Sequence, residues 1–147
     1  MKGTYCLIVD LDKDSIIKIG KVLGEIEFKK GCYVYIGSAM NSLEGRVRRH
    51  LSNDKRKHWH IDYLLLNDST NVLNVMMHVS DEKMECELAR HISENEKTVP
   101  KFGCSDCNCE SHLIYFENSQ LAIEKIKEAC KKLKIQYLTL EDFNHFQ

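Results

Sequence analysis

Two short tripeptides near the start of the chain constrain its fold more than any other feature. Gly3-Thr4-Tyr5 opens a β-branched and aromatic run, and Tyr35-Ile36-Gly37 closes an alternating run that begins at Gly31. Both runs have the composition of strands, and a lone strand must pair with another, so residues 4–9 and 31–37 are predicted to be antiparallel neighbours. Glycines at their ends would allow a backbone or a substrate to approach closely. Tyr5 and Tyr35 would then share one sheet.

A helix is predicted directly after the second tripeptide. Ser42 is a suitable N-cap, and Leu43 and Val47 recur at the spacing of a buried helical stripe. Arg46 and His50 are four residues apart, so their side chains share another helical face. Two tyrosines from strands and one guanidinium from a helix could therefore converge on one phosphate group.

The rest of the chain alternates between strand-like and helical segments. Further strands are predicted at 15–19, 72–79 and 113–116, and further helices at 59–66, 81–92 and 119–133. This order favours an α/β (α+β) fold with a small, mostly antiparallel sheet flanked by helices. The 147 residues are expected to form one domain, with the last of these helices as a C-terminal extension.

Overall composition narrows the class of protein but does not choose its function. A net charge of −1 does not by itself indicate a nucleic-acid-binding protein. No apolar run is long enough to span a bilayer, and no hydrophobic signal core follows the N-terminus, so a cytoplasmic protein with no membrane partner is expected. Four of the seven cysteines stand singly among apolar or helical neighbours, as buried reduced thiols do: Cys6, Cys32, Cys86 and Cys130.

Local charge is strongly positive after the predicted Arg46 helix. Residues 46–57 carry six Lys or Arg side chains against one acidic residue. Such a run is either a solvated face or a surface for backbone phosphates, and its position after Tyr35-Ile36-Gly37 favours the second. The predicted nucleic-acid-binding residues are Arg49, Lys55, Arg56, Lys57, His58 and His60. Trp59 could stack on a base or anchor its helix.

These motifs together resemble the GIY-YIG nuclease superfamily. The chain has Gly-Thr-Tyr where that family usually has Gly-Ile-Tyr, and residues 43–50 fit its Leu-x-x-Arg-x-x-x-His pattern. It is similar to the Uri-type branch in His-Trp-His-Ile-Asp-Tyr-Leu at 58–64 and Ser-Asp-Cys-x-Cys-x-Ser-His at 105–112. The resemblance extends from Gly3 to about Tyr115.

The resemblance implies an endonuclease that hydrolyses phosphodiester bonds in DNA, in repair or processing, with RNA not excluded. It makes Tyr5 the general base and Tyr35 a partner of the attacking water or of Tyr5. Arg46 would hold the scissile phosphate bidentately, as a guanidinium does better than an ammonium. His50 is expected to hydrogen-bond either the phosphate or a tyrosine.

The resemblance also implies a divalent metal, Mg²⁺ or Mn²⁺. Glu85 occupies the position of the family's carboxylate ligand, and Glu82 and Glu87 are rivals for that role. Mg²⁺ binds readily through one protein carboxylate, phosphate oxygens and waters. Gly103 stands where the family often has asparagine.

The segment after Gly103 is rich in soft ligands. Cys104, Cys107, Cys109 and His112 could hold a structural Zn²⁺, or the thiols could simply be reduced and packed near the active site. Two functions therefore compete with the endonuclease. One is a nucleic-acid-binding module that kept the fold and lost cleavage, and the other is a zinc or redox accessory protein.

Overall fold

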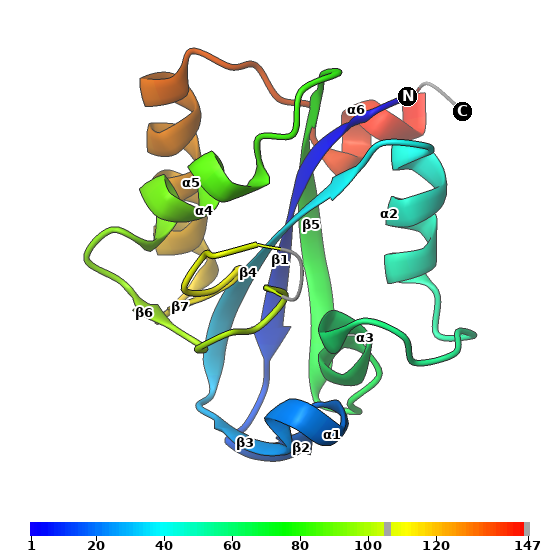
Figure 1. Cartoon of the computed structure of the whole chain (residues 1–147), viewed down its shortest axis with the longest axis vertical. Coiled ribbons are helices and arrows are strands. Elements are labelled where there is room, and N and C mark those ends of the chain that lie inside the picture. Colours follow the sequence, from blue (N-terminus) through cyan, green and yellow to red (C-terminus); the bar gives the residue numbers. More distant parts are fainter. Residues whose placement is uncertain (105–106, 146–147) are drawn as a thin grey trace.

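The computed structural model describes residues 1–104 and 107–145 and has a small antiparallel sheet at its centre (Figure 1). The strand order is β5-β1-β4-β7-β6, and each neighbouring pair is antiparallel. The five strands are β1 (Gly3–Leu11), β4 (Gly31–Ala39), β5 (Thr70–Val79), β6 (Lys97–Thr98) and β7 (Leu113–Phe116). The predicted fold class is confirmed.

The predicted pairing of the two tyrosine-bearing strands is also confirmed. Tyr5 of β1 lies opposite Gly37 of β4, and Tyr35 of β4 lies opposite Leu7. A Cβ atom on Gly37 would lie 2.5 Å from the Tyr5 hydroxyl oxygen, so only glycine lets the Tyr5 ring cross this point of β4. A Cβ atom on Gly3 would overlap the carbonyl oxygen of His78 in β5.

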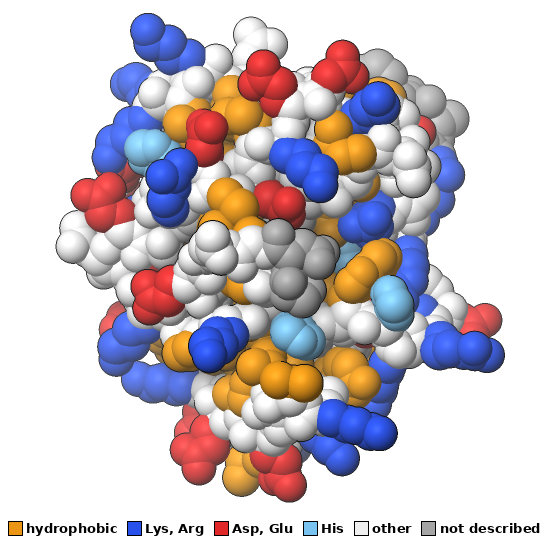
Figure 2. Space-filling model, viewed as in Figure 1, with side chains coloured by type: hydrophobic (Ala, Val, Ile, Leu, Met, Phe, Trp, Pro, Cys, Tyr) orange, Lys and Arg blue, Asp and Glu red, His pale blue; other side chains and the backbone are white. Residues whose placement is uncertain are grey.

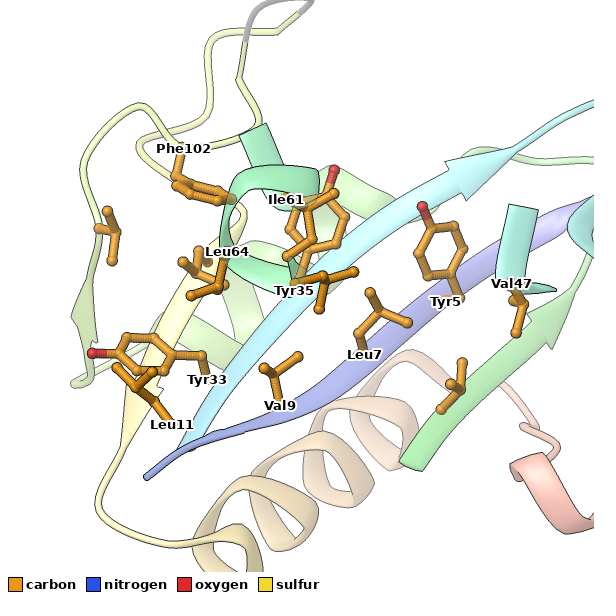
Figure 3. Close-up of a cluster of buried hydrophobic side chains, with 14 of the residues drawn as sticks. Tyr5, Leu7, Val9, Leu11, Tyr33, Tyr35, Val47, Ile61, Leu64 and Phe102 are labelled. Atoms are coloured by element: carbon orange, nitrogen blue, oxygen red, sulfur yellow. The ribbon is translucent and has the colours of Figure 1, made fainter. Parts of the chain in front are cut away.

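Alternating residues of β1 supply two separate hydrophobic cores, one on each face of the sheet. Tyr5, Leu7, Val9 and Leu11 pack on the face that also buries Val47 and Leu64 (Figure 3). Cys6 and Ile8 pack on the opposite face with residues of two other helices. Because Tyr5 and Tyr35 belong to the first core, the sheet presents both phenols on one side.

Helices cover both faces of the sheet. Figure 1 shows α2 (Leu43–Leu51) and α3 (His60–Leu65) on one side and α4 (Glu85–Ser93) and α5 (Ser119–Leu133) on the other. The remaining elements are α1 (Gly20–Leu23), α6 (Leu140–His145) and a separate hairpin of β2 (Ser15–Lys18) and β3 (Glu25–Phe28). Within the described ranges, no helix combines the length and apolar character needed to cross a membrane.

The predicted helix from Asp81 begins four residues later, at Glu85. Side-chain oxygens accept hydrogen bonds from the backbone N–H groups of the residues before Glu85. Ser80 Oγ accepts from the N–H of Glu82 at 3.0 Å, and Thr4 Oγ1 accepts from the N–H of Met84 at 3.1 Å. Such side-chain acceptors compete with helical hydrogen bonds. The sheet thereby fixes where α4 starts.

Candidate functional site

One pocket gathers four of the five residues expected to be catalytic or to bind the divalent metal. Tyr5, Tyr35, Arg46 and Glu85 line a cavity of about 390 Å³. They come from β1, β4, α2 and the first turn of α4, and Figure 3 shows the hydroxyl groups of Tyr5 and Tyr35 pointing the same way. The other lining residues are Gly37, Ser38, Met40, Asn41, His58, Trp59, His60, Lys83 and Gly103.

His50 lies behind Tyr5 and does not line the pocket. Its Nε2 atom is 2.7 Å from the Tyr5 hydroxyl oxygen, and the residue is only 2% exposed. Of the two expected partners, the structure selects a tyrosine. The other expected partner, a phosphate, would have to reach a ring that α2 packs against the core.

The protonation state of His50 follows from its burial. Burial, with the nearby Lys55 ammonium, lowers the pKa of His50 to about 3, so the ring is neutral at physiological pH. Its Nδ1 atom has no hydrogen-bond partner among the described residues. A buried orphan N–H is rarer than a buried orphan acceptor, which favours a bare Nδ1 and an Nε2–H that donates to Tyr5. The Tyr5 oxygen then accepts this hydrogen bond, and its own hydroxyl proton does not point at His50.

Both pocket tyrosines are neutral phenols in the resting protein. Burial raises the pKa of Tyr5 to about 12, even though the Arg46 guanidinium acts in the opposite direction. Burial, and then the neighbouring Tyr5, raises the pKa of Tyr35 well above its ordinary value. Arg46 is thus the residue that favours the phenolate form of Tyr5.

Arg46 is held in place from two sides. Its Nη1 atom donates to the carbonyl oxygen of Ser38 at 3.1 Å, and its guanidinium lies 4.4 Å from the centre of the Trp59 ring. The Arg49 guanidinium also lies over this ring, at 4.2 Å. Cation–π contacts of this kind orient a guanidinium. They favour the anchoring role of Trp59 over base stacking.

Arg49 forms an internal ion pair with a buried carboxylate. Its two terminal nitrogens donate to Asp62 at 2.9 and 2.8 Å, and Asp62 also accepts the backbone N–H groups of His58 and Trp59.

Lys55 likewise points inward and donates to the carbonyl oxygens of Arg49 and His50 at the end of α2. Arg49 and Lys55 therefore have a structural role, and their contact with phosphate stays a prediction. Arg56, Lys57 and His58 are exposed, as expected.

Replacing Asp62 should destabilise the fold strongly. Asp62→Ala would leave the Arg49 guanidinium and two backbone N–H groups without their acceptor, so we expect the free energy of unfolding to fall by about 3–5 kcal/mol. Urea denaturation measures this change. Asp54→Ala removes an exposed carboxylate of the segment between α2 and α3 and should change stability by less than about 0.5 kcal/mol. Equal stability of the two variants would contradict this role of Asp62.

Glu85 is positioned by Thr4, a residue to which the sequence assigned no task. The Thr4 hydroxyl is buried, accepts the N–H of Met84 and lies 3.2 Å from the Ser38 hydroxyl. Thr4 occupies the position where Gly-Ile-Tyr motifs have isoleucine. The polar residue therefore ties the tyrosine strand to the first turn of α4.

Gly103 closes the pocket beside His60. Its N–H donates to His60 Nδ1 at 2.9 Å, so the other ring nitrogen of neutral His60 carries the proton. Burial lowers the pKa of His60, which keeps the ring neutral. Gly103 has a φ of +73°, and a Cβ there would lie 3.1 Å from the Tyr35 ring. Glycine suits this left-handed and crowded position.

A group of soft ligands lies next to this pocket wall. Cys86, Cys107, Cys109 and His112 place one ligand atom each within 4.8 Å of one another, so the group could hold a metal ion. Cys86 replaces Cys104 in the predicted set. The Cys104 thiol instead donates to the carbonyl oxygen of Phe102 at 3.4 Å. Cys86 was expected to be a buried single thiol, and this prediction is wrong: the residue is only partly buried and belongs to the cluster, because α4 packs against the segment before β7.

The fold and these features define an α+β protein with a tyrosine-lined polar pocket and a Cys₃His cluster beside it. A family model described as "Domain of unknown function DUF123" matches residues 4–135, and the chain belongs to this family. No curated protein and no solved structure matches the chain. The matched range includes Tyr5, Tyr35, α4 and the whole cluster.

Proposed function

We propose that this protein is a divalent-metal-dependent endonuclease of the GIY-YIG type, acting on DNA in repair or processing. The observation that carries the proposal is the single pocket shared by Tyr5, Tyr35, Arg46 and Glu85. Phosphodiester hydrolysis needs a base for water, a cation for the phosphoryl oxygens and a divalent ion. The pocket offers a residue for each of these needs.

Tyr5 is the proposed general base, and two neighbouring groups favour its phenolate form against the effect of burial. An Nε2–H of His50 would donate to the phenolate oxygen at 2.7 Å, and the nearby Arg46 guanidinium adds a favourable charge. Arg46 would also hold the scissile phosphate through its guanidinium fork. Tyr35, on the neighbouring strand, would hydrogen-bond the attacking water.

Glu85 is the proposed ligand of Mg²⁺ or Mn²⁺, since a hard carboxylate in a polar pocket suits these ions. A divalent ion held there would stabilise negative charge on the leaving oxygen. Glu82 and Glu87 do not line the pocket, which supports Glu85 among the three rivals. For the Cys₃His cluster we infer Zn²⁺, because thiolate and imidazole donors favour it over Mg²⁺.

The surface around the pocket is suited to a nucleic-acid backbone. Lys and Arg side chains lie along the side of the visible face where α2 lies, and others lie on the side of α4 and α5, with acidic side chains among them (Figures 1 and 2). The exposed Arg56, Lys57 and His58 follow α2 there. They would contact phosphates and draw the substrate towards Arg46. This electrostatic contact is common to DNA and RNA.

Cleavage of labelled nucleic acids tests the proposal directly. Purified protein is incubated with duplex, flapped and branched DNA and with RNA, in buffer without added metal and after addition of Mg²⁺ or Mn²⁺. Metal is withheld by omission, since a strong chelator would also strip zinc. We expect metal-dependent cleavage of DNA. Protein that binds these substrates and cuts none with either ion would support the binding-module alternative instead.

Glu85→Gln should impair the response to metal. The amide keeps the size of the side chain and loses its charge, so at low Mg²⁺ we expect the cleavage rate to fall by about 100-fold and to recover partly in excess Mg²⁺. A titration of rate against Mg²⁺ concentration measures both effects. Glu87→Gln, on the exposed side of the same helical turn, is the matched control and should follow the wild type. A larger defect in Glu87→Gln would move the metal ligand to that residue.

A further inference from the structure

The Cys₃His cluster joins two parts of the chain that border the pocket. Cys86 is the second residue of α4, whereas Cys107 and Cys109 lie in the segment before β7 and His112 is the residue directly before that strand. A metal ion bound by all four would therefore cross-link α4 to this segment.

The distances fit a tetrahedral ion. His112 Nε2 lies 3.8 Å from Cys86 Sγ and 3.5 Å from Cys107 Sγ. Zn–S bonds of about 2.3 Å and Zn–N bonds of about 2.0–2.1 Å in a tetrahedron separate sulfur from nitrogen by ~3.6 Å. Both observed values lie close to this figure. Since the four ligand atoms all lie within 4.8 Å of one another, closure around one ion needs only small side-chain movements.

One ligand is already fixed by the sheet. His112 is 3% exposed, its backbone N–H donates to Phe102, and its carbonyl oxygen accepts the N–H of Ile36 in β4. These two bonds set the position of the imidazole before any metal binds. A buried histidine facing thiols from two segments is the arrangement that structural zinc sites use.

We propose that one Zn²⁺ held by Cys86, Cys107, Cys109 and His112 clamps residues 107–112 to α4 and so fixes the pocket wall. Binding of the ion does not depend on any nuclease activity. Its role in holding Glu85 in position as a metal ligand rests on the proposed function. Glu85 lies between two anchors: Met84 donates to Thr4, and Cys86 would bind the ion. His112 donates to the carbonyl oxygen of Phe102, so the same clamp would also steady the adjacent Gly103, which donates to His60 in the opposite wall.

Metal content and cobalt substitution test the ligand set. Protein purified without chelators should contain about one zinc per chain, and apo-protein reloaded with Co²⁺ should show the visible bands of a tetrahedral thiolate site. Cys86→Ser should weaken Co²⁺ binding by about 100-fold or more, since even partners outside the coordination sphere cost about 10–100-fold. Cys104→Ser is the matched control and should bind like the wild type. Cys109→Ser provides a second ligand variant.

Trp59 reports whether the clamp reaches the pocket. It is the only tryptophan and lines the pocket next to His60, so adding Zn²⁺ to apo-protein should shift its emission. The shift should persist in Cys104→Ser and disappear in Cys86→Ser and in His60→Ala, although His60→Ala still binds zinc. Absence of metal uptake, or a defect in Cys104→Ser alone, would overturn the ligand set. Zinc binding without a Trp59 response in the wild type would overturn the clamp.

These measurements also separate the clamp from the nuclease. If the protein takes up zinc and shifts Trp59 emission but cuts no substrate, the clamp is supported and the nuclease proposal is contradicted. If the protein cuts DNA with Mg²⁺ but takes up no zinc, the nuclease proposal is supported and the clamp is contradicted.

Discussion

Arg46→Ala should lower the rate of DNA cleavage by about 10³-fold while weakening DNA binding by only about tenfold or less. The guanidinium is proposed to stabilise charge that develops on the phosphate in the transition state, and loss of one such donor costs about 10²–10³ in rate. Arg46 also favours the phenolate form of Tyr5, so its removal should impair the base as well. Binding depends on many phosphate contacts, of which Arg46 supplies one.

Single-turnover cleavage and equilibrium binding, measured on the same labelled DNA, separate these two effects. Arg56→Ala is the matched control, because it removes an exposed arginine of the basic surface outside the pocket. It should reduce the salt dependence of binding by about one ion and leave the cleavage rate of bound DNA unchanged. If Arg46→Ala lost binding and cleavage in the same proportion, its role would be that of an ordinary phosphate contact.

Arg46→Lys distinguishes charge from geometry at the same position. Lysine keeps the positive charge but has no planar fork. Its single ammonium cannot lie over the Trp59 ring and donate to the Ser38 carbonyl oxygen at the same time, as the Arg46 guanidinium does. We therefore expect cleavage between that of the wild type and that of Arg46→Ala.

The central sheet was predictable because its signals are local. Alternation along β1 and β4 distinguishes two faces, and the tyrosines fall on the face that receives α2 and α3. The edges of the fold were less predictable. β6 has only two residues and exists through its pairing with β7, and α4 begins late because Thr4, far away in sequence, accepts a bond from Met84. Contacts between residues far apart in the sequence do not produce a periodic pattern of residues from which an element could be predicted.

The candidate site shows the same division. The motif residues of the pocket could be named from spacing, since each stands at a defined point of a strand or helix. The ligand set could not be completed in this way: neighbours in sequence suggested Cys104, whereas packing of α4 against the segment before β7 brings in Cys86. Charge alone also did not reveal the structural role of Arg49, because its partner Asp62 lies on another helix.

Tyr5→Phe should reduce cleavage by about 10³-fold or more while preserving the pocket. The substitution removes one oxygen from a ring that is 1% exposed and packed in the core, so the ring contacts with Tyr35 and His50 remain. His50 Nε2 would lose its buried partner, and a stability loss of about 1–3 kcal/mol is expected. Loss of the general base, rather than unfolding, should then account for the rate.

The pH dependence gives this prediction its sharpest test. Because burial raises the pKa of Tyr5 to about 12, the phenolate is the minor form at neutral pH, and the wild-type cleavage rate should rise about tenfold per pH unit between roughly pH 6 and 8. Tyr5→Phe should lose this rise along with the activity. Tyr33→Phe is the control, since Tyr33 lies in β4 and the same core but outside the pocket and donates to the Lys29 carbonyl oxygen. A Tyr5→Phe protein that cut DNA as fast as Tyr33→Phe, with the same pH profile, would assign the base to another group and leave Tyr5 as a packing residue.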